Sequence, residues 1–143
     1  MCILIIEVAA VLALLLTGQA QSVPATPAPA MPPVIVIGFV GGFISHDNPN
    51  HSEVQLAARL RQAYPSGVEV ETFESYHKGK ARKRVLRLLD TNHDGVLNLD
   101  EKQNARIIIY GHSWGGSATV AMARRLEKDG IPVLLTVQVD SIS

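Results

Sequence analysis

Four short apolar runs recur along the chain, and helical patterns separate them. The runs cover residues 34–37, 68–73, 107–110 and 131–139. Between them, residues 52–64, 78–89 and 114–126 repeat apolar side chains at the three- and four-residue spacing of helices. The run at 68–73 alternates apolar and acidic residues, which is typical of a strand near a sheet edge. Strands that alternate with helices predict an α/β fold whose parallel sheet of about four strands is flanked by helices.

The first helix is expected to begin with a capping box formed by Ser52 and Gln55. Its apolar face is expected to contain six residues: Val54, Leu56, Ala57, Leu60, Ala63 and Tyr64. The helix at 78–89 is basic and amphipathic, and we interpret its charged side as a solvated face.

The N-terminal segment differs from the rest. Residues 3–16 are apolar except for Glu7, and the small residues Gly18 and Ala20 follow. This pattern predicts a signal peptide over residues 1–20 and a secreted or periplasmic protein, with a membrane anchor as the alternative. Residues 21–33 are rich in proline and alanine and are expected to form an extended linker. The folded domain is therefore expected over residues 34–143.

Composition and net charge limit the partners and cross-links that the sequence predicts. The formal net charge of the 143 residues is +0, so no electrostatic argument favours nucleic acid as a partner. The single cysteine, Cys2, lies before the apolar leader, so no disulfide is expected. Nothing in the sequence identifies a protein partner.

The segment 106–117 carries the first chemical motif. An apolar strand pattern leads directly into G-H-S-W-G at residues 111–115, and a helical pattern follows. A tight turn between strand and helix would present the Ser113 hydroxyl above the sheet. Gly111 and Gly115 would leave room for the strand and helix to pass closely.

This motif resembles the nucleophile elbow of the α/β-hydrolase family, in particular its lipases and esterases. The resemblance implies that Ser113 is a nucleophile acting on a small-molecule or lipid ester. It implies oxyanion donors at the backbone N–H of Trp114 and of Phe39 or Val40, in the Gly-rich segment after the first strand. Asp140 follows the last strand pattern and could be the acid of the triad.

Residues 90–101 read D-T-N-H-D-G-V-L-N-L-D-E and resemble the twelve-residue EF-hand calcium loop. Gly95 takes the sixth position, where the loop turns sharply. The expected oxygen ligands are Asp90, Asn92, Asp94, the carbonyl of Val96, Asn98 and Glu101. Only about one helical turn can follow before the strand at 107, so we expect a structural Ca²⁺ site and not a calcium sensor.

One part of the expected triad is absent from the sequence. The five histidines are His46, His51, His77, His93 and His112, and none follows Ser113 as the family order requires. His112 is expected to point away from the nucleophile and to pack. A sheet that ends on its last strand would also expose apolar surface. We therefore expect a C-terminally truncated piece of a hydrolase, which would be inactive if the missing histidine is its base; the alternative is a non-catalytic calcium-binding module with a vestigial elbow.

Overall fold

The computed structural model describes residues 32–142, so the predicted signal peptide and most of the predicted linker lie outside the described residues. The elements are β1 (Val34–Val40), α2 (Ser52–Ala63), β2 (Val68–Glu74), α3 (Lys78–Leu89), α4 (Leu99–Gln103), β3 (Ile107–His112), α5 (Trp114–Lys128) and β4 (Leu135–Val139). The four strands form one parallel sheet in the order β2-β1-β3-β4. The predicted α/β fold is confirmed.

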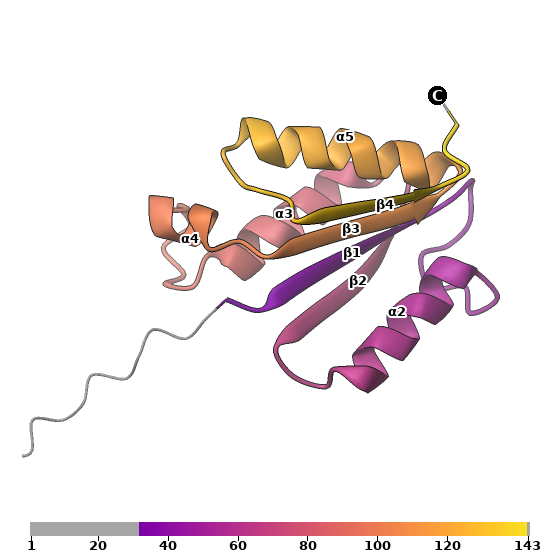
Figure 1. The fold of residues 1–143 in the computed structure, drawn as a ribbon, viewed down its shortest axis with the longest axis horizontal. Coiled ribbons are helices and arrows are strands. Elements are labelled where there is room, and N and C mark those ends of the chain that lie inside the picture. Colours follow the sequence, from indigo (N-terminus) through magenta and orange to yellow (C-terminus); the bar gives the residue numbers. More distant parts are fainter. Residues whose placement is uncertain (1–31, 143) are drawn as a thin grey trace, which may run out of the picture. The chain divides into compact units, whose positions relative to one another are not determined.

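The helices lie on both faces of the sheet. Figure 1 shows α2 on one face, and α3 and α5 together on the other. Side chains of β1 alternate between these faces: Ile35, Ile37 and Phe39 pack toward α3 and α5, and Val36 packs toward α2. This burial on both faces explains why β1 reads as a continuous apolar run.

All four strands differ from their predicted bounds: β2 ends one residue later, β3 ends two residues later, and β1 and β4 differ by three and four residues. β1 continues through Gly38 to Val40, three residues beyond the predicted end at 37. A side chain at Gly38 would collide with the Tyr110 ring, so the glycine marks close packing inside the sheet and not the start of a turn. β4 begins at Leu135 and not at 131, because the N–H of Ile131 bonds to the C-terminal end of α5 at the carbonyl of Leu126.

The predicted capping box of α2 is wrong. The N-cap is His51, whose side chain makes no capping hydrogen bond, and the Ser52 hydroxyl donates to the Glu53 carboxylate instead. The capping box of the described chain occurs in α4, where Asn98 and Glu101 exchange hydrogen bonds. The predicted apolar face of α2 is only partly correct, because Leu56, Ala63 and Tyr64 are exposed and Tyr64 lies beyond the end of the helix.

The sheet leaves part of one face open. β2 lies at one edge, as its alternating pattern predicted, and β4 lies at the other. The expected exposed apolar surface is present on β4, where Leu135, Val137 and Val139 are all exposed. Val137 and Val139 line a groove of about 450 Å³ beside α2. Within residues 32–142, none of the helices combines the length and apolar character needed to cross a membrane.

Candidate active site

Ser113 lies at the apex of the turn between β3 and α5. It is the N-cap of α5, with φ 56° and ψ −123°, a conformation that side-chain-bearing residues rarely adopt. Its N–H donates to the carbonyl of Val139 at 2.9 Å, which ties the turn to the end of β4. The carboxyl ends of parallel strands face ligands in open α/β sheets, so Ser113 occupies the edge where such sites form.

Glycine contacts hold this turn. A Cβ at Gly111 would lie 2.9 Å from the Thr119 hydroxyl and closer still to the backbone of Gly115. A Cβ at Gly115 would lie 2.8 Å from the carbonyl carbon of Phe39. The beginning of α5 therefore passes directly against both β3 and β1, and no larger residue fits at either position.

The expected oxyanion donors occupy different environments. Trp114 is the first residue of α5, where helical N–H groups have no partner within the helix. Phe39 and Val40 lie inside β1, and their side chains are fully buried. The turn that reaches Ser113 begins one residue later, at Gly41. The assignment of Trp114 and of Phe39 or Val40 stays a prediction.

Asp140 follows β4 at the same edge of the sheet. Its Oδ2 atom lies 3.8 Å from Nε2 of His112, and both side chains are largely exposed. His112 is therefore not packed in the interior, as the sequence analysis expected. The strand continues only to Val139, and Asp140 has φ 46°. The structure places Asp140 beside His112, the residue that precedes the nucleophile.

A second carboxylate at this edge holds two histidines. Glu74, the last residue of β2, lies 2.8 Å from Nδ1 of His46 and 2.6 Å from Nδ1 of His77. Burial raises the pKa of the Glu74 carboxyl, but the hydrogen bonds from His77 and His46 outweigh it and lower the pKa to about 2. Glu74 thus joins the loop after β1 to the loop after β2. This cluster could not be predicted from the sequence, because no local pattern links its three residues.

An aromatic cavity lies beside the turn. It has a volume of about 510 Å³ and is lined mainly by apolar side chains, among them Phe43, Tyr76, Trp114 and Ile142. The ring of Phe43 meets Trp114 edge to face at 5.3 Å. An apolar group attached to a reacting acyl carbon could be accommodated here.

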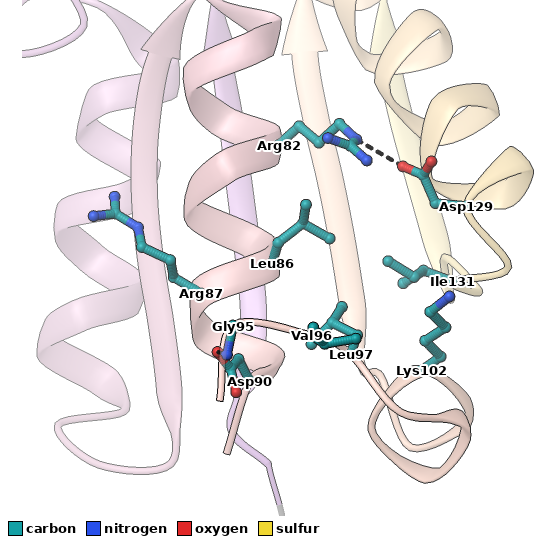
Figure 2. Close-up of a pocket in the computed structure, with 10 residues that line it drawn as sticks. All are labelled: Arg82, Leu86, Arg87, Asp90, Gly95, Val96, Leu97, Lys102, Asp129 and Ile131. Carbon is teal, nitrogen blue, oxygen red and sulfur yellow. Dashed lines mark hydrogen bonds and ion pairs between the residues drawn. The ribbon is translucent and has the colours of Figure 1, made fainter. Parts of the chain in front are cut away.

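The predicted calcium loop connects α3 to α4. Gly95 has φ 83°, as the sharp turn at the sixth position requires, and its N–H donates to Oδ2 of Asp90 at 3.0 Å. The other Asp90 oxygen, Oδ1, is buried and has no hydrogen-bond partner. Figure 2 shows Asp90 and Gly95 together at the C-terminal end of α3, away from the Arg82–Asp129 ion pair.

The residues of this loop offer oxygen ligands of the kind that a hard cation such as Ca²⁺ prefers, and the binding of Ca²⁺ stays a prediction. Glu101 is buried, and the N–H of Asn98 lowers the pKa of its carboxyl most, with further lowering from Thr91. An ionised carboxylate and the orphaned oxygen of Asp90 are groups that a cation would stabilise. Within residues 32–142, no three His, Cys, Asp or Glu side chains converge to hold a metal, so the site would also depend on amide and main-chain oxygens.

Comparison of the chain with protein-family models, curated proteins and solved structures finds no match.

Proposed function

We propose that this chain is an exported serine hydrolase that acts on carboxylic esters, in the manner of the α/β-hydrolases it resembles. The observation that carries the proposal is the backbone of Ser113, which has φ 56° at the apex between β3 and α5. Strained positions of this kind persist only where the surroundings enforce them, and they cluster at active sites. Here glycines on both sides of the apex enforce it.

In this proposal the Ser113 oxygen attacks the acyl carbon of the ester, and the alcohol leaves from the resulting tetrahedral intermediate. The N–H of Trp114 at the start of α5 stabilises the developing oxyanion. The Ser113 proton must pass to a base, because a neutral hydroxyl is a poor nucleophile; the base returns this proton to the leaving alcohol, and water then cleaves the acyl-enzyme. In the family that the chain resembles, this base is a histidine that follows the serine, and the sequence has none at that place. The apolar cavity beside Trp114 supports a small-molecule or lipid ester as the substrate.

The predicted loop at residues 90–101 would bind Ca²⁺ through the oxygen ligands that the sequence analysis identified. A bound cation would satisfy the buried Oδ1 atom of Asp90. Its role would be structural, since the loop connects α3 to the short helix that precedes β3. No step of the ester chemistry passes through this site.

The test uses a fluorophosphonate probe and p-nitrophenyl esters of increasing acyl length on wild type and Ser113→Ala. An activated Ser113 predicts that wild type is labelled at this residue and hydrolyses the esters, and that Ser113→Ala loses both activities. Ser66→Ala changes an exposed serine in the connection between α2 and β2 and serves as the matched control. Equal hydrolysis by wild type and Ser113→Ala would reject the hydrolase proposal and favour a calcium-binding module.

A further inference from the structure

A buried carboxylate lies at the start of α2, and the ester chemistry described above does not use it. The side chain of Glu53 is only 4% exposed, although the residue belongs to the first turn of a helix on the surface of the domain. Burial of an ionisable group is unfavourable unless polar partners compensate it. The partners of Glu53 therefore indicate why the residue is there.

These partners come from three separate segments. Oε1 accepts the N–H of Gly41 at 3.3 Å, in the turn that follows β1. Oε2 accepts the hydroxyl of Ser52 at 2.9 Å and lies 3.7 Å from Nδ1 of His51. The main-chain carbonyl of Glu53 accepts the buried hydroxyl of Tyr110 in β3 at 2.8 Å. The first turn of α2 is thus fixed to both central strands.

Gly41 connects this carboxylate to the nucleophile. A Cβ built on Gly41 would lie 3.3 Å from Cβ of Ser113 and 2.8 Å from the carbonyl oxygen of His112. The turn after β1 therefore lies in contact with the elbow. The hydrogen bond from the Gly41 N–H to Glu53 is the side-chain contact that holds this turn from the side of α2.

We propose that Glu53 is a positioning residue, which holds the turn at Gly41 against Ser113 and so fixes the wall of the site opposite the elbow. This role rests on the proposed hydrolase function. The carboxylate acts as a hydrogen-bond acceptor and exchanges no proton with the substrate. A displacement of about 1 Å in a catalytic geometry can lower a rate by about 100-fold, so loss of this one contact should slow acylation.

The test compares Glu53→Ala with Glu53→Gln, whose amide oxygen can still accept from Gly41. We expect Glu53→Ala to lower the second-order rate of fluorophosphonate labelling by about 10- to 100-fold, and in ester hydrolysis to lower kcat with little change in KM. Glu53→Gln should keep most of the rate. Glu127→Ala, on an exposed face of α5, is the control for loss of a glutamate.

Hydrogen exchange at the Gly41 amide gives a readout that does not depend on catalysis. We expect slow exchange in wild type and Glu53→Gln, and faster exchange in Glu53→Ala while the protected amides of β1 remain slow. If Glu53→Gln loses as much labelling as Glu53→Ala, the carboxylate acts through its charge or proton and the positioning role is rejected. Unchanged labelling and exchange in Glu53→Ala would also reject it. If wild type is not labelled at all, the hydrolase proposal fails, and the exchange data report separately on the contact.

Discussion

Replacement of Gly115 by alanine tests whether close packing sets the position of the elbow. The added Cβ would lie 2.8 Å from the carbonyl carbon of Phe39 and 3.2 Å from that of Val40. The carbonyl oxygen of Phe39 would lie closer still, and because non-bonded heavy atoms pack best at about 3.5–4.0 Å, α5 and β1 must separate by about 1 Å or more. Both clashing groups are backbone in a fully buried central strand and cannot rotate away.

The expected loss of stability follows from two opposing terms. Overpacking of this kind costs about 1–3 kcal/mol, and the rigid backbone neighbours favour the upper end. Alanine in place of glycine inside a helix returns about 0.5–1 kcal/mol. The net destabilisation of Gly115→Ala is therefore about 2 kcal/mol, which corresponds to a decrease in Tm of about 10 °C for a domain of this size.

Gly79→Ala separates the effect of close packing from the effect of helix propensity. Gly79 also lies in a helix, in the first turn of α3, but a Cβ there would have no neighbour within 4 Å. Gly79→Ala should therefore raise the stability slightly, by about 0.5 kcal/mol. Urea unfolding followed by circular dichroism measures both variants. A Gly115→Ala variant as stable as wild type would refute the argument that the elbow is fixed by close contact.

Two further predictions concern carboxylates away from the elbow. Calorimetry should detect Ca²⁺ binding to wild type and none to Glu101→Gln. Ca²⁺ at about 100 times its dissociation constant should raise the free energy of unfolding of wild type alone by about 2.7 kcal/mol. Equal Ca²⁺ binding by both proteins would exclude the predicted loop as the calcium site. His77→Ala should raise the pKa of Glu74 from about 2 toward 4.5, because it removes a hydrogen bond to the ionised carboxylate that a glutamine could replace. A lowered pKa of Glu74 contributes to the free energy of unfolding above about pH 4.5, and this contribution is lost as the pH falls toward 2. Because the pKa of Glu74 in the variant lies nearer 4.5, the carboxylate should stabilise the variant less than wild type above pH 4.5. Carboxyl NMR titration checks this, and an unshifted Glu74 would contradict it.

The parts of the site that could be predicted from the sequence depend on contacts between residues that are near each other in the sequence. The strand pattern at 107–110, the serine and the helix after it are contiguous, and Gly111 packs on Gly115 only four residues away. A local motif therefore contains most of the information needed to place Ser113. The same holds for α3, whose predicted bounds agree with the structure, because its apolar stripe is formed within one helix.

Predictions that depended on a distant partner were less accurate. The glycine at position 38 suggested a turn, but the ring of Tyr110, far along the chain, fills the space beside it and keeps it in β1. The sequence does not reveal this pairing before the order of the strands is known. Likewise, the pattern at 131–139 does not show that Ile131 bonds back to α5 and that the strand begins only at Leu135.

Glu53 was missed although the sequence contains a signal for it. Glu53, Ala57 and Leu60 are spaced by four and three residues, so they share one stripe of α2. Ala57 is fully buried and Leu60 is partly buried, which places the acidic side chain on the inward face. A charged residue on an apolar stripe is informative because it requires a buried partner. Its identity, Gly41, depends on the path of the loop after β1.

The ends of the four strands are not built alike, and this difference bears on function. Around the end of β3, close backbone contacts occur at three glycines, which are Gly41 after β1, Gly111 in β3 and Gly115 in α5. Between Gly111 and Gly115, Ser113 has an unfavourable φ. The φ of Ser113 costs stability relative to an ordinary backbone conformation, whereas the glycines are required there because a Cβ would clash with neighbouring backbone. At the end of β2, Glu74 is held only by side-chain hydrogen bonds from flanking loops. A parallel sheet can therefore end a strand without close backbone contacts or a strained residue, and their occurrence together at Ser113 supports the proposal that this serine is a nucleophile.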